Sequence, residues 1–176
     1  RLDHAADRLQ VAGGATQPTR YNQSIASVGY FQQFNRLSVR LDGELDNYTY
    51  DNNGLGPAQG VMLNSDRDRL ELYQVLRLNY EFSPGYEVWS RAALNQRNYA
   101  NVPDSSGFNR NSSGWSVVAG LAVDFGGITS AEIFAGYVQQ NYQGFQTLSA
   151  PTFGLTANWN PLPELRIKPF VRRTVE

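Results

Sequence analysis

The chain has 176 residues, a length that suits one domain with a sizeable buried surface. Its 15 Lys and Arg nearly balance its 16 Asp and Glu, so no net charge favours nucleic acid as a partner, and the absence of cysteine excludes disulfides, thiolate chemistry and cysteine-bound zinc. The longest nearly apolar stretch, residues 117–123, is far shorter than the roughly 20 residues of a membrane-spanning helix.

The first twenty residues carry no strand pattern. No charged segment followed by an apolar one opens the chain, so we expect a signal peptide to be removed or to lie outside this sequence. We interpret residues 1–20 as the end of a preceding strand and an extracellular loop. His4, the one histidine, lies here beside Asp3 and Asp7, where a solvated position is expected. Residues 24–34 follow as a strand with imperfect alternation.

From Leu37 onward the alternation is clean. Leu37, Leu41 and Leu45 fall on one face, while Arg40 and Asp42 fall on the other. This is the period of two residues that a strand requires, not the 3.6 of a helix. The same pattern predicts strands over residues 70–82, 86–99, 115–125, 131–142, 153–159 and 165–175. The sequence therefore predicts about eight strands, each long enough for the roughly 9 to 11 residues of an oblique bilayer crossing.

The connections between these strands alternate between short and long. Tight turns are predicted at residues 35–36, 83–85, 126–127 and 160–161. Long connections rich in Asn, Gly, Ser and Pro are predicted at residues 51–66, 100–114 and 143–151. Short turns on one side and long loops on the other are typical of a bacterial outer-membrane barrel, in which the short turns are periplasmic.

Aromatic side chains gather near both ends of the predicted strands. Rings with an apolar body and a polar tip favour the boundary between membrane and water. Aromatic residues also favour strand ends in any β protein, so the pattern alone leaves both interpretations open. The predicted aromatic girdle comprises Phe34, Tyr48, Tyr50, Tyr80, Phe82, Tyr86, Tyr99, Trp115, Phe125, Tyr137, Tyr142 and Trp159.

These patterns predict an all-β protein, a transmembrane antiparallel up-and-down β-barrel. If the apolar face meets lipid, the polar face lines a lumen, and every backbone amide has to be paired around a closed cylinder. We interpret residues 21–176 as one domain of barrel strands and loops. A wide aqueous channel needs about 16 or more strands. Because the sequence stops within a strand pattern, we expect part of a larger barrel, incomplete at both ends.

Five short segments resemble a known family. They are residues 18–21 (PTRY), 34–41 (FNRLSVRL), 80–84 (YEFSP), 136–137 (GY) and 169–176 (PFVRRTVE). On these segments the chain resembles the β-barrel porin 2 family of Gram-negative outer-membrane proteins, often found with exopolysaccharide-export systems. The resemblance runs through nearly the whole chain and implies a barrel of about eighteen strands, wide enough to conduct. Its motifs are hairpin signatures, so it bears on fold and membrane more than on substrate.

Charged side chains dominate the predicted lumen face. Such cations could steer an anionic solute or an acidic polysaccharide. The simpler interpretation is that Arg and carboxylate groups of neighbouring strands only pair with each other across the wall. The predicted lumen-lining residues are Arg40, Asp42, Glu44, Arg67, Arg69, Glu71, Arg77, Glu81, Glu87, Arg91, Arg97, Arg166, Lys168 and Arg172.

Catalytic and metal sites have little support. Asp42 and Glu44 share a face and could be written as a carboxylate pair, but alternation forces this placement on any polar strand. Asp51, Asp66 and Asp68 could hold a calcium ion at the base of a loop, a suggestion that rests on oxygen ligands alone. We therefore expect no enzymatic activity, no cofactor and no resident metal.

The function predicted from the sequence is that of a porin-like conduit in the outer membrane of a Gram-negative bacterium. The family resemblance links it to exopolysaccharide export. The expected partners are outer-membrane lipid, lipopolysaccharide and components of the export system. The alternative is a structural or surface-interaction barrel whose loops, at residues 51–66 and 100–114, bind a partner.

Overall fold

A computed structural model describes residues 19–54, 61–126, 128–162 and 164–173, most of which form one antiparallel sheet. Its long strands are β1 (Tyr21–Phe34), β2 (Leu37–Tyr50), β5 (Arg69–Ser83), β6 (Tyr86–Tyr99), β7 (Ser112–Phe125), β8 (Thr129–Tyr142) and β9 (Leu148–Leu162). The short elements are β3 (Asn53–Gly54), β4 (Val61–Met62), the 3-10 turn η2 (Ser65–Arg67), β10 (Leu165–Ile167) and β11 (Phe170–Arg173). None of the described helical segments is long and apolar enough to cross a membrane.

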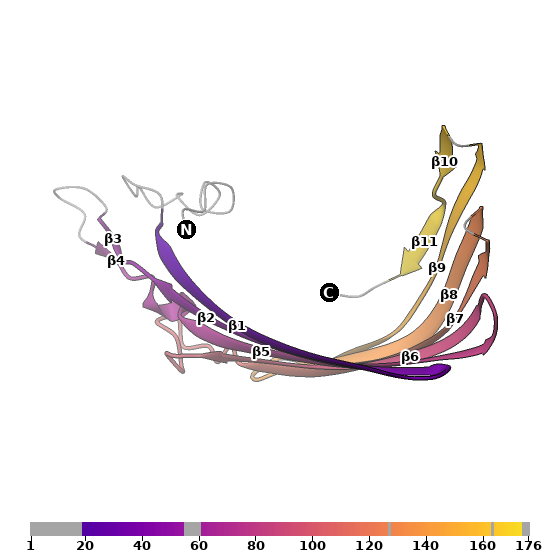
Figure 1. The fold of residues 1–176 in the computed structure, drawn as a ribbon. Coiled ribbons are helices and arrows are strands. Elements are labelled where there is room, and N and C mark those ends of the chain that lie inside the picture. Colours follow the sequence, from indigo (N-terminus) through magenta and orange to yellow (C-terminus); the bar gives the residue numbers. More distant parts are fainter. Residues whose placement is uncertain (1–18, 55–60, 127, 163, 174–176) are drawn as a thin grey trace.

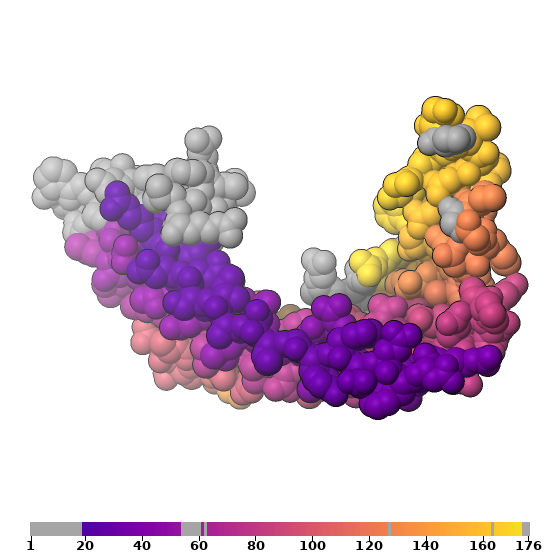
Figure 2. Space-filling view, in the orientation of Figure 1, coloured from indigo at the N-terminus to yellow at the C-terminus, as the bar shows by residue number. Residues whose placement is uncertain are grey.

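The strands follow one another across the sheet in chain order. The order is β1-β2-β5-β6-β7-β8-β9-β10, and β11 also pairs with β9, while β3 and β4 form a separate hairpin. Each pairing is antiparallel, which confirms the predicted all-β up-and-down topology. The sheet curves into a trough with short turns at one rim and longer connections at the other (Figure 1). The space-filling view shows an open hollow between the N-terminal strands, in indigo, and the C-terminal strands, in yellow (Figure 2).

The register gives the sheet two chemically different faces. One transverse row runs through Leu41, Leu76, Ala92, Val117 and Tyr137, all directly opposite one another. We call this side the apolar face. Its leucines are not packed under a second layer, since Leu41 and Leu121 are each 50% exposed. An apolar surface of this extent, exposed across so many strands, calls for a hydrocarbon environment.

The opposite side, the polar face, is the concave one. A hollow on this face is lined jointly by Glu81 of β5 and Arg172 of β11, with side chains of the strands between them. Strands so far apart in the sheet can share one hollow only on the inside of its curvature. The charged side chains therefore face the interior of the trough.

The strand β9 departs most from the sequence prediction. It begins at Leu148, so the loop before it covers residues 143–147 instead of 143–151, and it continues through Pro161 to Leu162, beyond the predicted turn at 160–161. Proline is tolerated in a strand where its nitrogen needs no partner. Pro151 lies opposite Tyr137 of β8, and Pro161 lies past the last β8 pair, Thr129 with Trp159, where no β8 partner needs its N–H.

The final predicted strand is interrupted. Lys168 and Pro169 separate β10 from β11, so residues 165–173 form two short strands instead of one continuous strand. The proline lacks the N–H that a continuous ladder would require at this point. Its carbonyl still accepts a hydrogen bond from the Ala157 amide at 3.0 Å, which keeps the segment against β9.

Large rings cover glycines on the polar face. A transverse row runs Trp89, Gly120, Phe134, Gly154 and Arg172. A Cβ added at Gly120 would lie 2.7 Å from the Trp89 ring, and one added at Gly154 would lie 2.6 Å from the Phe134 ring. The two rings are 6.2 Å apart between centroids. Each ring thus packs in the space that its neighbouring glycine leaves open, and the row interlocks four adjacent strands, β6 to β9.

This packing predicts that Gly120→Ala destabilises the sheet. The added methyl group would overlap the Trp89 ring and the Ile133 carbonyl, at a cost of about 1–3 kcal/mol. Urea unfolding of the folded protein in detergent micelles, followed by tryptophan fluorescence, measures the change. Gly43→Ala is the matched control, because its Cβ would meet the nearest atom, Val28 Cγ1, at an ordinary 3.5 Å. Equal unfolding midpoints for the two variants would contradict the packing argument.

Candidate functional site

Most of the predicted lumen residues lie on the concave polar face. The strand register places there Arg40, Asp42, Glu44, Arg69, Glu71, Arg77, Glu81, Glu87, Arg91, Arg97 and Arg172. Arg166 of β10 donates to the Asn160 side chain at 3.2 Å. Arg67 lies in η2 and Lys168 between β10 and β11, so these two are not strand residues as the alternation had implied.

The loop end of the polar face holds a network of paired charges. Glu71 Oε1 accepts hydrogen bonds from Arg69 Nε at 2.6 Å and from Arg97 Nε, on the next strand, at 2.9 Å. The Arg69 guanidinium also lies 4.3 Å from the centroid of the Tyr48 ring and donates to the Tyr50 hydroxyl at 3.2 Å. Here the charged groups pair with one another across the wall, as the simpler interpretation predicts.

Four aromatic residues of the predicted girdle lie on the polar face. Each of them lies directly opposite a residue of the polar face on a neighbouring strand. The pairs are Tyr48 with Gln23, Tyr50 with Tyr21, Tyr99 with Arg69, and Tyr142 with Ser112. They therefore cannot form part of a ring of aromatics on the apolar face. Arginine stacking on tyrosine rings explains the placement of Tyr48 and Tyr50.

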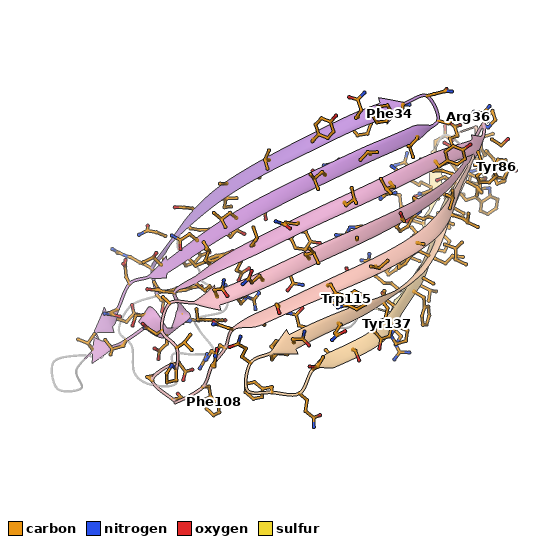
Figure 3. All side chains as sticks on the ribbon, turned by 90° about the horizontal axis from the view of Figure 1, so that it is seen from below. Phe34, Arg36, Tyr86, Phe108, Trp115 and Tyr137 are labelled. Carbon is orange, nitrogen blue, oxygen red and sulfur yellow. The ribbon has the colours of Figure 1, made fainter. Side chains whose placement is uncertain are left out.

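The remaining girdle residues lie on the apolar face at two levels. Phe82, Tyr86 and Phe125 form a cluster beside the short turns, with the Tyr86 centroid 5.9 Å from each of the other two rings. Trp115 and Tyr137 pair at 6.2 Å closer to the long connections. Figure 3 shows Phe34 and Tyr86 at the short-turn end and Trp115 and Tyr137 farther toward the loops. Phe34, Tyr80 and Trp159 share this face by register.

The centre of the polar face carries three neighbouring arginines. Arg40, Arg77 and Arg91 lie directly opposite one another on β2, β5 and β6, and we call them the arginine row. Arg40 pairs with Asp42 at 2.7 Å, which places the predicted Asp42 and Glu44 carboxylate pair beside a cation. Arg77 Nε donates to Asn79 Oδ1 at 2.8 Å, and Arg91 donates to the Tyr73 hydroxyl.

The long connections contact one another. Asp66 Oδ2, just before β5, accepts the Ser105 amide at 2.9 Å, which joins the 51–66 connection to the 100–111 connection. Asn109 donates to Gln143 Oε1 at 2.7 Å, and the exposed rings of Phe108 and Phe145 stack at 6.2 Å, which joins the 100–111 connection to the 143–147 connection. Contacts among the three connections thus form one continuous surface, which we call the loop platform.

Asp104 organises the middle connection from within. Its Oδ1 accepts the amides of Ser106 at 2.9 Å and Phe108 at 2.8 Å, and its Oδ2 accepts Arg110 Nε at 2.5 Å. Backbone hydrogen bonds, that of Phe108 foremost, lower the pKa of the Asp104 carboxyl, and Ser105 lowers the pKa of Asp66. These carboxylates serve as acceptors for loop amides.

Two of the three suggested calcium ligands, Asp66 and Asp68, have protein partners instead. Asp68 Oδ1 accepts the Tyr50 amide at 2.7 Å, and Asp66 accepts the Ser105 amide. Within the described ranges no group of three or more His, Cys, Asp or Glu side chains is placed to hold a metal ion. His4, the other candidate for chemistry, lies outside the described residues.

A two-faced, curved, up-and-down sheet with sorted connections is the wall of a β-barrel, and comparison with known proteins agrees. The family model described as Putative beta-barrel porin 2 matches residues 2–176. The chain belongs to this family. No curated protein and no solved structure matches it.

Membership of a beta-barrel porin family gives the two faces their meaning. In a porin barrel the outward face meets lipid and the inward face meets water. The exposed apolar face of this chain has the character of a lipid-facing surface, and the arginine row lies on the opposite, concave face. The family's porin name also indicates an outer-membrane location.

The alternation predicted the two faces of the sheet. The interlocked rings and the loop platform depend on how neighbouring strands are aligned, which a single sequence does not display.

Replacing Asp104 with alanine is expected to open the loop platform while leaving the sheet intact. The Ser106 and Phe108 amides lose their acceptor and Arg110 loses its partner. Limited proteolysis should then cut within residues 100–111, with unchanged heat stability of the barrel on gels. Asp51→Ala, at an exposed aspartate of the neighbouring connection, is the control. Protection of the 100–111 segment in Asp104→Ala would show that other contacts hold it.

Acid should have the same effect on the unmodified protein. Because the pKa of Asp104 is lower in the folded loop than in an unfolded chain, its contribution is complete above the ordinary Asp pKa of about 3.9 and is lost as pH falls through the lower folded value. Hydrogen exchange at the Ser106 and Phe108 amides, corrected for intrinsic rates, should accelerate in that range. Unchanged protection there would contradict this assignment.

Proposed function

We propose that the protein is a passive conduit for polar solutes across the outer membrane of a Gram-negative bacterium. The observation that carries this proposal is the contrast between the two faces of the curved sheet. The apolar face exposes large hydrophobic side chains, such as that of Leu121, which is 50% exposed. The hollows of the concave face, in contrast, are lined in part by arginine and carboxylate side chains. Lipid satisfies the first surface and water the second.

Both edges of the sheet need partners in such an environment. Within the described strands, β1 and the β10–β11 edge are not paired with each other. Hydrocarbon cannot solvate unpaired backbone N–H and C=O groups, so a membrane-embedded sheet has to be closed. We propose that further strands complete the wall, and that the resulting barrel has a lumen wide enough for water.

The cargo we propose is an extracellular polysaccharide, exported through the lumen. Support comes from the family resemblance and from the hydrophilic, hydrogen-bonding character of the concave face. Partners would then be outer-membrane lipid and lipopolysaccharide at the apolar face and components of an export system at either mouth. We propose no reaction and no cofactor for the chain itself.

A second candidate function rests on the loop platform. Its contacts hold three connections in one arrangement, and Phe108 and Phe145 are 53% and 61% exposed there. Ordered loops with exposed aromatic rings suit the capture of a partner at the cell surface. A sealed barrel, together with loss of partner binding on removal of residues 104–110, would favour this function over the conduit.

The conduit proposal predicts ion conductance. The protein reconstituted into planar lipid bilayers should produce discrete conductance steps, because charged side chains keep the concave face hydrated. Buffer with empty detergent micelles is the control. A folded, inserted protein that leaves the bilayer electrically sealed would contradict the proposal.

A paired arginine scan tests which face meets lipid. Leu121→Arg on the apolar face should impair insertion, at a cost of about 2–4 kcal/mol for arginine near the bilayer midplane. Ala122→Arg, the next residue on β7, places the same charge between Glu87 and Glu132 on the polar face and should insert normally. Folding into vesicles, followed by the gel-mobility shift of folded barrels, measures the difference. Equal insertion of the two variants would contradict the assignment of the faces.

A further inference from the structure

Three like charges lie side by side at the centre of the polar face. Arg40 is directly opposite Arg77, and Arg77 is directly opposite Arg91. Like charges in directly opposed positions of neighbouring strands destabilise a sheet. Nearer the loops, the cations Arg69 and Arg97 share the carboxylate of Glu71. In the Glu71 network each cation contacts a carboxylate, whereas Arg77 and Arg91 of the arginine row do not.

The partners of the row leave most of its charge uncompensated. Arg40 has the carboxylate of Asp42, but Arg77 and Arg91 donate to an amide oxygen and a phenol, which are neutral. Within the described part of the chain, neither Arg77 nor Arg91 forms an ion pair. A guanidinium carries five N–H donors in a fixed fork, so both side chains retain donors for an outside acceptor.

The row borders two adjoining hollows. Arg77 and Arg91 line both of them, one of about 490 Å³ and one of about 570 Å³. Volumes of roughly 300–1,000 Å³ are typical of small-molecule sites. Arg172 also lines the first hollow, together with one carboxylate, Glu132. By register Glu132 lies closer to the row of Arg172 than to that of Arg91.

The wall of the first hollow contains an unused donor. Trp89 is 5% exposed, and its indole Nε1 has no hydrogen-bond partner. The Arg77 guanidinium lies 4.6 Å from the centroid of this ring. Buried side-chain donors normally have a partner, so one without a protein acceptor calls for an explanation. Three carboxylates also line the two hollows, those of Asp42, Glu44 and Glu132, but none of them forms a hydrogen bond or ion pair with Arg77, Arg91 or Trp89.

We propose that Arg77 and Arg91, with Arg40 and Trp89 beside them, form a binding site for the oxyanions of an acidic polar solute. This proposal rests on the conduit function and specifies which solutes the conduit favours. Guanidinium forks bind carboxylate or sulfate groups through paired, charge-assisted hydrogen bonds. The solute supplies the negative charge that the row lacks.

The direction of the row matters for passage. Its members come from neighbouring strands, so they form a belt across the wall instead of a ladder along it. A belt of cations selects at one depth, where an anion exchanges part of its hydration shell for guanidinium groups and then leaves on the other side. Selection is thus separated from the paired charges nearer the loops.

Ion selectivity in planar bilayers is the first test. Under a KCl gradient, the reversal potential of the unmodified protein should show preference for chloride, and Arg77→Gln/Arg91→Gln should shift it toward the value of an unselective pore. Arg69→Gln/Arg97→Gln is the matched control, since it also removes two charges from the polar face of β5 and β6, but from the Glu71 network. An unchanged reversal potential in Arg77→Gln/Arg91→Gln, or an equal shift in Arg69→Gln/Arg97→Gln, overturns the proposal while leaving the conduit intact.

Direct binding is the second test and does not depend on conductance. The chain has three tryptophans, and only Trp89 lies on the polar face, so a Trp115→Phe/Trp159→Phe background reports on the site. Oligogalacturonate, which carries carboxylates, should change Trp89 fluorescence, and Arg77→Gln should weaken its binding at least about tenfold, the factor for one charge-assisted hydrogen bond. Maltotriose is the uncharged control. Equal binding of the two sugars overturns the proposal.

Stability separates a binding role from a structural one. Because the row places like charges together, Arg77→Gln and Arg91→Gln should unfold at the same urea concentration as the unmodified protein or at a higher one. A structural role predicts earlier unfolding of both variants. Loss of oligogalacturonate binding at unimpaired stability is the expected result, and loss of stability with retained binding overturns it.

Discussion

Backbone pairing in continuous register is the constraint from which the rest of the structure follows. Each long strand between β2 and β9 is hydrogen-bonded to a neighbour on both sides, so alternate side chains have no choice of face. A shift of one residue would bring Leu41 into the trough and turn Arg40 toward lipid. The apolar face and the charged face are thus two results of one register, and the curvature of the sheet decides which of them encloses water.

The sequence predicted elements well where one residue type dominated each face. Alternation and turn residues alone predicted the first residue of β2, Leu37, and both bounds of β6. β9 extends beyond its predicted bounds at both ends, because Pro151 and Pro161, residues typical of loops and turns, lie within the strand. Proline disrupts a strand only where its nitrogen would have donated to a partner, and for Pro161 that depends on where the pairing of β8 with β9 ends. A single sequence gives no information on that position.

The sequence predicted which residues belong to the candidate site, but not that they lie directly opposite one another. Alternation identified Arg40, Arg77 and Arg91 as lumen residues, yet their direct opposition depends on the relative register of three strands. The misassigned aromatic residues have a different cause. Position near a strand end suggested that Tyr48 and Tyr50 belong to a girdle, whereas alternation along β2 places both rings on the polar face, where Arg67 and Arg69 lie over them. Extending the alternation of β2 beyond residue 46 would have predicted this placement, since Tyr48 and Tyr50 are an even number of residues from Arg40 and so lie on the same face.

The distribution of paired and unpaired charges along the polar face has a physical order. Near the loops, Glu71 pairs with two arginines of the wall, and Asp104 pairs with Arg110 in the connection that follows β6. Toward the centre, the interlocked rings of Trp89 and Phe134 supply the packing, so the arginines beside them are not needed as structural ion pairs. The rings that fill the spaces above Gly120 and Gly154 hold the strands together by packing, without the use of ion pairs. Packing of this kind lets a sheet tolerate opposed arginines at the depth where a solute would meet them.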